Sequence, residues 1–301
     1  MSIEVKDLVK IYGEQKAVDT ISFKVGKGEI VGFLGPNGAG KSTTMKIITG
    51  YLRQDGGEVS VCGIPVNDQA TETKKKIGYL PEANPLYYDM YVREYLAFIA
   101  AVHRLDNRKD RIEESIRRVG LTLESRKKLG QLSKGYKQRA GLAAALVHDP
   151  EVLILDEPTT GLDPNQILEI REVIRDLGRN KTVLFSSHIL QEVEAVCDRV
   201  VIINKGRLVA DSSLDDLRRT DSNIIKVHFK ESVHRQQLEA LEGVRSVNNT
   251  DSCHWELESG DPGGVKKQLL ELALQNNLNI VSLQSEEKSL EDSFRRLTNG
   301  Q

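Results

Sequence analysis

The residues best suited to chemistry in this chain begin with a glycine-rich loop, GPNGAGKST, at positions 35–43. Four of its residues match the pattern GxxxxGK[ST], in which glycines let backbone N–H groups surround phosphate oxygens. The lysine adds a positive charge, the serine hydroxyl can bind Mg²⁺, and a helix beginning near Lys41 adds the dipole of its N-terminus. The loop therefore predicts a nucleotide-phosphate site. Its expected contacts are Gly35, Pro36, Asn37, Gly38, Ala39, Gly40, Lys41, Ser42 and Thr43.

Two acidic residues follow an apolar run in the stretch EVLILDEP at 151–158. Such a run predicts a buried strand, and open α/β sheets bind ligands at the carboxyl ends of their strands. We expect Asp156 to hold Mg²⁺, directly or through water, and Glu157 to orient the water that attacks the γ-phosphate. The alternative is that both acids only begin a helix before Pro158.

A histidine ends another apolar run, TVLFSSH, at 182–188. If this run is a strand of the same sheet, His188 lies on the same edge as Lys41 and Asp156. A neutral imidazole there could bridge the γ-phosphate and the attacking water. A single histidine is also commonly a surface or capping residue, and its position alone leaves both alternatives open.

The remaining pattern predicts the elements that position these groups. Short apolar runs alternate with helical patterns, which indicates a parallel α/β sheet with right-handed crossovers. Residues 2–8 and 20–29 alternate apolar and polar side chains, as antiparallel strands do. Residues 87–147 are helical in pattern, and 199–211 predict a hairpin turned at Lys205–Gly206. We therefore expect an α/β P-loop fold with an antiparallel β subdomain and a helical subdomain.

A second domain is predicted after a seam at LRRTDSNI, residues 217–224. The elements beyond it follow the order βαββαβ, which is typical of a ferredoxin-like α+β domain. A last short helix is expected at 289–298, with Ser289 as its cap. We therefore expect a nucleotide-binding domain at 1–218 and a small C-terminal α+β domain at 222–301.

Composition limits the environment and the partners of the chain. With 301 residues, a formal net charge of −2 and 29% charged residues, it is typical of a globular protein with no bulk attraction to nucleic acid. No apolar run approaches the ~20 residues that span a bilayer, and MSIEVKDLVK has no signal core. We therefore expect a cytoplasmic protein without a nucleic-acid partner. The scattered Cys62, Cys197 and Cys253 argue against disulfides and are expected to be buried.

The stretch QLSKGYKQR at 131–139 has no role in a phosphate site made by one chain. It contains an LSGGQ-like turn, here Leu132, Ser133, Lys134, Gly135 and Tyr136. With GPNGAGKST before it, and LILDEPTTGLDP and His188 after it, the set resembles the ATP-binding cassette (ABC) ATPases over residues 1–215. The resemblance implies ATP hydrolysis with ATP and Mg²⁺ as cofactors.

The resemblance also implies roles that span two chains. In this family two cassettes pack head to tail, so Ser133 and Gly135 would contact the γ-phosphate held by a second copy. Asp163 matches the acid of a loop that crosses the dimer interface, and Tyr12 matches the aromatic that stacks on adenine. The local alternatives are an N-cap for Ser133, an Asx turn for Asp163 and core packing for Tyr12.

Three positions depart from the family pattern. Glu82 replaces the usual glutamine after the strand ending YLP; a carboxylate can still bind Mg²⁺ but adds negative charge near the phosphates. Lys134 and Tyr136 replace residues of the signature. We expect Lys134 either to add charge near the phosphates or, preferably, to face water.

Five of the eight tyrosines lie close to Glu82 in the sequence: Tyr79, Tyr87, Tyr88, Tyr91 and Tyr95. In the family this region receives a short helix of a transmembrane permease, so we expect Tyr87, Tyr88 and Met90 to contact such a partner. The alternative is a core aromatic cluster. The residues with helical spacing, Tyr95, Phe98, Ile99 and Val102, are expected to face the core of the helical subdomain.

The cassette and its tail together resemble the bacterial ATP-binding subunits of multidrug- and polysaccharide-type exporters, including the gliding-motility-associated type. This implies a homodimer held on the inner face of the cell membrane by a multi-span permease. Two other classes remain as alternatives. A soluble ABC ATPase of DNA repair or translation would carry a long coiled coil or two cassettes, and a P-loop kinase or GTPase would leave 131–139 without a role.

Overall fold

The computed structural model describes residues 1–67, 71–220, 223–249, 251–286, 294 and 298. The chain forms two compact units, Met1–Leu214 and Asp215–Gln301. The stretch expected to be a seam contains a helix, α8 (Leu214–Thr220). Asp215 and Asp216 lie in its first turn, where negative charge stabilises a helix N-terminus.

The first unit is built on a six-stranded sheet with the order β10-β9-β3-β8-β7-β6. Its strands are β3 (Ile30–Leu34), β6 (Ile77–Leu80), β7 (Val152–Leu155), β8 (Thr182–Ser187), β9 (Arg199–Asn204) and β10 (Arg207–Ser213). All neighbours are parallel except the edge pair β9–β10. That pair is the expected hairpin, and both turn residues, Lys205 and Gly206, have the positive φ that a two-residue turn requires.

A second, antiparallel sheet has the order β2-β1-β4-β5. Its strands are β1 (Ile3–Tyr12), β2 (Gln15–Val25), β4 (Gly56–Val61) and β5 (Ile64–Pro65). The first two strands run further than the alternation at 2–8 and 20–29 predicts. Register shifts between Val5 and Ile11 interrupt the alternation, so the sequence pattern ends before the strands do.

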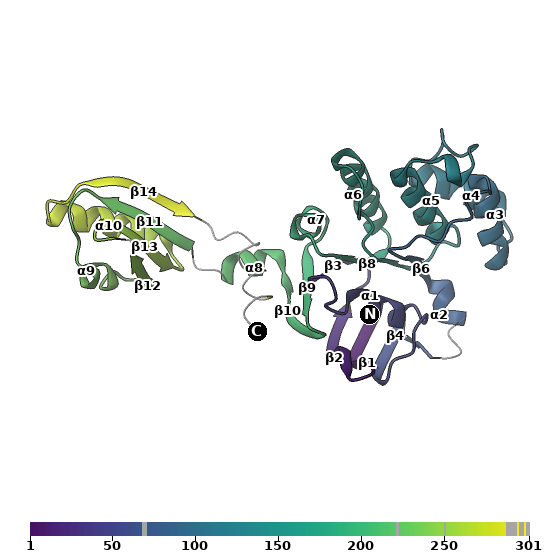
Figure 1. Cartoon of the computed structure of the whole chain (residues 1–301), viewed down its shortest axis with the longest axis horizontal. Coiled ribbons are helices and arrows are strands. Elements are labelled where there is room, and N and C mark those ends of the chain that lie inside the picture. The colour runs from purple at the N-terminus through teal and green to yellow at the C-terminus, as the bar shows by residue number, and fades with distance from the viewer. Residues whose placement is uncertain (68–70, 221–222, 250, 287–293, 295–297, 299–301) are drawn as a thin grey trace. The chain divides into compact units, whose positions relative to one another are not determined.

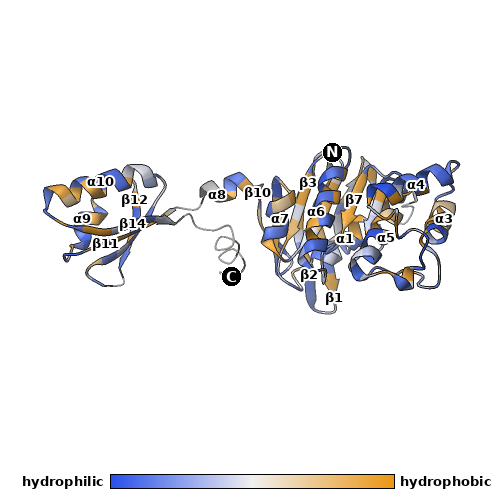
Figure 2. Cartoon of the chain, turned by 90° about the horizontal axis from the view of Figure 1, so that it is seen from above, coloured by the Kyte–Doolittle hydropathy of each residue, from blue (hydrophilic) through white to orange (hydrophobic). Residues whose placement is uncertain are grey.

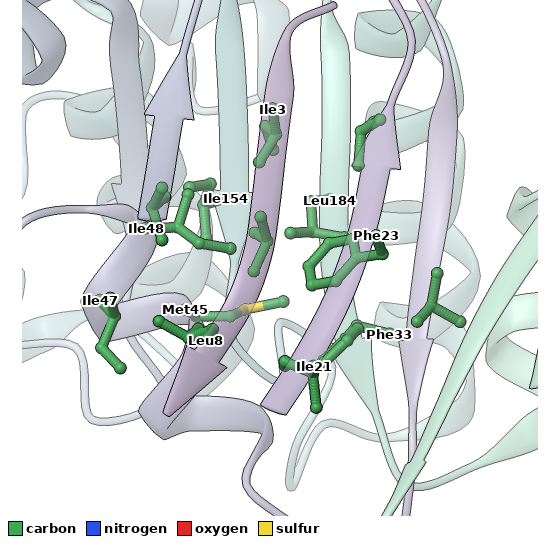
Figure 3. Close-up of a cluster of buried hydrophobic side chains, with 14 of the residues drawn as sticks. Ile3, Leu8, Ile21, Phe23, Phe33, Met45, Ile47, Ile48, Ile154 and Leu184 are labelled. Atoms are coloured by element: carbon green, nitrogen blue, oxygen red, sulfur yellow. The ribbon is translucent and has the colours of Figure 1, made fainter. Parts of the chain in front are cut away.

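Helix α1 (Lys41–Ile48) and the antiparallel sheet cover one face of the six-stranded sheet, while α6 (Pro164–Gly178) and α7 (Leu190–Val196) cover the other (Figure 1). Figure 3 shows the core between the two sheets, where Phe23 and Phe33 meet with ring centroids 5.4 Å apart. Buried side chains from β1, α1, β7 and β8 complete this core: Ile3, Leu8, Met45, Ile47, Ile48, Ile154 and Leu184. Figure 2 shows apolar residues concentrated in the strands of the six-stranded sheet.

The helical subdomain lies between β6 and β7 in the sequence. It contains α3 (Val92–Val102), α4 (Arg108–Arg118), a 3-10 turn at Leu129–Gln131 and α5 (Lys134–Leu146), and a short helix, α2 (Thr71–Lys76), precedes β6. The expected core stripe of α3 is wrong in part, because Phe98 and Val102 are 43% and 63% exposed. The helix is apolar on several sides, and it buries the stripe of Val92, Leu96 and Ala100 instead.

The second unit has the predicted ferredoxin-like order. Its elements are β11 (Asn223–Phe229), α9 (Arg235–Glu239), β12 (Val244–Asn249), β13 (His254–Ser259), α10 (Pro262–Gln275) and β14 (Ile280–Glu286). The strands form an antiparallel sheet, β12-β13-β11-β14, over a core that includes Phe229, Trp255 and Leu269. The helix expected at 289–298 lies outside the described residues apart from 294 and 298.

The cysteines are only partly as expected. Cys197 is buried, but Cys62 and Cys253 are half-buried. All three are free thiols.

Candidate nucleotide site

Three neighbouring strands bring the chemically distinctive residues to one edge of the sheet. Strand β8 lies between β3 and β7, and all three are parallel, so their carboxyl ends share that edge. The glycine-rich loop follows β3, Asp156 and Glu157 follow β7, and His188 follows β8. The predicted edge is therefore the one that the fold builds.

The glycine-rich loop closes over the lysine that follows it. Lys41 begins α1, is only 6% exposed, and donates from Nζ to the carbonyl oxygens of Gly35 (2.8 Å) and Pro36 (3.2 Å). Gly40 has φ 109°, and a Cβ there would lie 2.5 Å from the carbonyl oxygen of Ala17. Only glycine fits this position, so the tight turn into α1 depends on it.

Asp156 is 1% exposed and receives two hydroxyl hydrogen bonds on the same oxygen. Ser42 Oγ donates to Asp156 Oδ1 at 3.0 Å, and Ser186 Oγ donates to it at 2.7 Å. A hydroxyl and a carboxylate at this spacing offer the hard oxygen ligands that Mg²⁺ prefers. Among the described residues no cluster of three or more His, Cys, Asp or Glu could hold a metal ion.

Glu157 links the lysine to the histidine. Its side chain is 6% exposed; Oε1 lies 3.3 Å from Lys41 Nζ, and Oε2 lies 2.9 Å from His188 Nδ1. Thr160 Oγ1 donates to Oε2 at 3.2 Å. Glu157 has φ 50°, a backbone conformation that side-chain-bearing residues rarely adopt. Outliers of this kind persist where surrounding contacts fix them, here at the centre of the site.

Two of these residues, Ser186 and Thr160, were not predicted from the sequence. Thr160 lies in the acidic motif itself, three residues after Glu157. Ser186 interrupts an otherwise apolar buried strand with a hydroxyl, and it is 0% exposed. A hydroxyl residue near the carboxyl end of a buried strand could have indicated Ser186 in the sequence, because a buried hydroxyl needs a polar partner.

The signature lies apart from this cluster. Ser133 is exposed and caps α5, accepting a hydrogen bond from the Tyr136 N–H at 3.4 Å. Asp163 caps α6 and accepts from the Gln166 N–H at 2.9 Å. Both local alternatives are thus realised. Within the described part of the chain, no hydrogen bond or ion pair joins Ser133 or Gly135 to the residues of the glycine-rich loop, Asp156, Glu157 or His188.

The two signature departures contact neighbours in the same chain. Lys134 is exposed, as the preferred expectation had it, and its Nζ occupies the space that a Cβ of Gly161 would need. The ring centroid of Tyr136 lies 6.0 Å from the guanidinium carbon of Arg139, at the limit of a cation–π contact. Arg139 itself pairs with Glu169 of α6.

The remaining predicted residues lie outside the cluster. Tyr12 ends β1, is 51% exposed, and has Lys10 Nζ 5.5 Å from its ring centroid. Glu82 is exposed in the loop after β6. Tyr87 and Tyr88 are 57% and 55% exposed, while Met90 is half-buried.

Tyr87 is packed on one side only. Its ring centroid lies 6.1 Å from that of Tyr95 and 5.8 Å from that of Phe98. Tyr88 lies beneath Lys137, whose Nζ is 5.1 Å from the ring centroid. These rings therefore form a partly open aromatic surface on the helical subdomain.

The fold and the strand-end cluster define a P-loop ATPase cassette, and comparison with known proteins agrees. Residues 18–160 match the family model described as ABC transporter, and 213–298 match "ATP-binding protein DrrA1-3-like, C-terminal domain". The chain is 35% identical to the bacitracin transport ATP-binding protein BcrA of Bacillus licheniformis, over 99% of this chain and 97% of that protein. It belongs to the ABC transporter family, as an ATP-binding subunit with ATPase activity.

Two further similarities bear on function. The chain is 35% identical to the Nod factor export ATP-binding protein I of Rhizobium etli, over 99% of this chain and 93% of that protein. The dimeric post-hydrolysis structure of the cassette MJ0796, bound to ADP and Pi, matches with a TM-score of 0.65 and 26% identity, covering 70% of this chain and 98% of that one. Family membership excludes the P-loop kinase and GTPase alternatives.

Proposed function

We propose that this subunit works as a head-to-tail homodimer that binds two ATP and drives a separate permease, as an exporter. Ser42 and Asp156, with Glu82 as a further ligand, would hold Mg²⁺, which supplies positive charge at the phosphate oxygens when bound. Lys41 binds the outer phosphates, Glu157 orients and polarises the attacking water, and His188, which lies beside Glu157, bridges the γ-phosphate and that water.

The observation that carries the dimer is the isolated signature. Ser133 begins an exposed helix N-terminus, which attracts anions, yet within the described residues it contacts no part of its own chain's phosphate site. A second copy supplies the missing anion if its ATP lies against Ser133 and Gly135. The dimeric arrangement of a similar cassette and the position of Asp163 at the start of α6 support the same arrangement.

The exposed aromatic surface supports a permease partner. Tyr87 and Tyr88 are more than half exposed on the helical subdomain, and aromatic residues concentrate where proteins bury surface against a partner. No helix among the described residues is long and apolar enough to cross a bilayer. A permease contacting Tyr87, Tyr88 and Met90 would hold the subunit on the inner face of the cell membrane. Export as the direction is supported by the similarity to the Nod factor export ATP-binding protein I.

Ser133→Asp tests the shared site. Aspartate caps a helix about as well as serine, so α5 stays intact, but its charge would repel a γ-phosphate. We expect ATP binding to the isolated monomer to be unchanged and turnover to fall by about 100-fold. Loss of ATP binding by the monomer, or unchanged turnover, would refute the role of Ser133 in a second copy's site. Asp261→Ser, which exchanges the cap of α10 in the second unit, is the matched control.

A further inference from the structure

One buried hydroxyl contacts both strand-end acids. Ser186, on β8 and 0% exposed, donates from Oγ to Asp156 Oδ1 at 2.7 Å and accepts from the Glu157 backbone N–H at 2.9 Å. We propose that Ser186 is a positioning residue for ATP hydrolysis, which fixes the metal-binding acid and the water-orienting acid as one unit. The inference rests on the roles proposed above for these two acids.

The chemistry of a hydroxyl suits this task. A serine hydroxyl can donate one hydrogen bond and accept others through its lone pairs. Ser186 donates its hydrogen bond to the Asp156 carboxylate and accepts one from the backbone N–H of Glu157. Glu157 has φ 50°, so its backbone is held in a region that non-glycine residues rarely adopt. The bond from its N–H to Ser186 fixes that conformation and so directs its carboxylate toward Lys41 and His188.

Ser186 differs from the second hydroxyl on Asp156. Ser42 also donates to Oδ1, at 3.0 Å, but it belongs to the glycine-rich motif and is itself a candidate ligand of Mg²⁺. Ser186 belongs to the central sheet and has no solvent exposure. Ser42 would serve as a ligand of Mg²⁺, whereas Ser186 would remain bonded to the Asp156 carboxylate.

Removal of the hydroxyl in Ser186→Ala gives a specific kinetic pattern. The half-saturating Mg²⁺ concentration of the ATPase should rise about tenfold and kcat should fall about tenfold, because one bond to a charged group and one to a strained backbone are lost. ATP binding measured in EDTA should stay within about twofold of wild type, because both hydrogen bonds of the Ser186 hydroxyl go to the acids and neither goes to the glycine-rich loop.

The other end of the same strand offers a matched control. Thr182 is 2% exposed; its Oγ1 donates to Ser2 Oγ at 2.8 Å and accepts from the Gly28 N–H at 3.0 Å. Thr182 Oγ1 also lies 3.3 Å from the Gly26 carbonyl oxygen, so Thr182→Val likewise removes a buried, hydrogen-bonded hydroxyl, but away from the acids. Both variants should lower the melting temperature, and only Ser186→Ala should change the Mg²⁺ dependence and kcat.

Two isosteric variants separate the hydroxyl from packing. Ser186→Thr keeps the hydroxyl and Ser186→Val replaces it with a methyl group, so the two side chains have nearly the same shape. We expect Ser186→Thr to keep a half-saturating Mg²⁺ concentration and kcat close to those of the wild type. Ser186→Val should instead show the higher half-saturating Mg²⁺ concentration and lower kcat expected of Ser186→Ala. Equal behaviour of this pair, or a Ser186→Ala pattern that matches Thr182→Val, would overturn the proposal. A failure of the underlying function would look different, because the wild type itself would lack Mg²⁺-dependent hydrolysis or Glu157→Gln would remain active.

Discussion

His188 Nδ1 lies 2.9 Å from Glu157 Oε2, although the two residues follow different strands. A carboxylate accepts, so His188 donates through Nδ1 and leaves Nε2 for another partner. The opposite oxygen of Glu157 lies 3.3 Å from Lys41 Nζ, so one carboxylate connects the phosphate-binding lysine to the histidine.

His188→Ala should separate hydrolysis from binding. Because His188 contacts Glu157 and not the glycine-rich loop, we expect kcat to fall by about 100-fold while the ATP dissociation constant changes less than about threefold. Steady-state ATPase assays and equilibrium binding of a fluorescent ATP analogue measure the two effects. An unchanged kcat would exclude a role for His188 in hydrolysis.

The buried ion pair of Lys41 and Glu157 should appear in a double-mutant cycle. Both side chains are 6% exposed, and removing one partner of a buried pair leaves an uncompensated charge that costs about 3 kcal/mol. Lys41→Met and Glu157→Gln should each destabilise the protein without nucleotide, and the double variant should lose about 1–2 kcal/mol less than their sum. Chemical unfolding followed by circular dichroism supplies the free energies. Strict additivity would show that the pair has no net coupling.

Arg139 should stabilise the cassette mainly through its hydrogen bond to Val119, the C-cap of α4. It is buried on α5, donates to the Val119 carbonyl oxygen at 2.7 Å, and pairs with Glu169. Arg139→Met leaves the Val119 carbonyl oxygen without this hydrogen bond and should lower the unfolding free energy by about 2 kcal/mol. Glu169→Gln should cost less than about 1 kcal/mol, because Glu169 is 57% exposed. Thermal unfolding of the two variants measures both effects. Similar losses of unfolding free energy in Arg139→Met and Glu169→Gln would contradict a dominant role for the bond from Arg139 to the Val119 carbonyl oxygen.

His148 should make the cassette sensitive to mild acid. Its ring stacks on that of His103 with centroids 3.9 Å apart, and burial, aided by the charge of His103, lowers the pKa of His148 to about 4. As the pH falls, His148 is therefore protonated at a higher pH in the unfolded chain than in the folded protein. The stabilising contribution is complete above about pH 6.5 and is lost as the pH falls toward about 4.

The test compares wild type with His148→Gln, which can still donate to the Ile77 carbonyl oxygen that lies 3.0 Å from His148 Nε2. Between about pH 7.5 and about pH 5, the wild type should lose about 2 kcal/mol more unfolding free energy than the variant. His234→Gln, at an exposed histidine of the second unit, should behave as wild type. If the unfolding free energies of wild type and His148→Gln fell in parallel with pH, His148 would be excluded as the source of the acid sensitivity.

Much of the phosphate edge was predictable because each motif ends a buried run. Lys41, Asp156 and His188 each follow an apolar strand, and parallel strands bring their carboxyl ends to one edge, so contact among their neighbours follows from order alone. Ser186 was not predicted, because a strand pattern shows that a residue is buried but not which neighbouring acid it reaches.

Other features depend on information that a linear pattern lacks. Helix α3 is apolar on several sides, so only its packing shows that Leu96 is buried and Phe98 exposed. Lys134 is exposed, as the preferred expectation had it, but the position of its Nζ beside Gly161 depends on how α5 meets the loop before α6. The proposed functional partners of Ser133 and Tyr87 belong to other chains, so the roles of these residues stay predictions.

The sharing of ATP between two copies is tested most directly by the molar mass of Glu157→Gln with saturating Mg-ATP. The variant should keep Lys41 and the glycine-rich loop, bind ATP and hydrolyse it too slowly to separate the two copies. Analytical ultracentrifugation should then show a dimer with ATP and a monomer with ADP. A monomer with bound ATP would contradict the shared site.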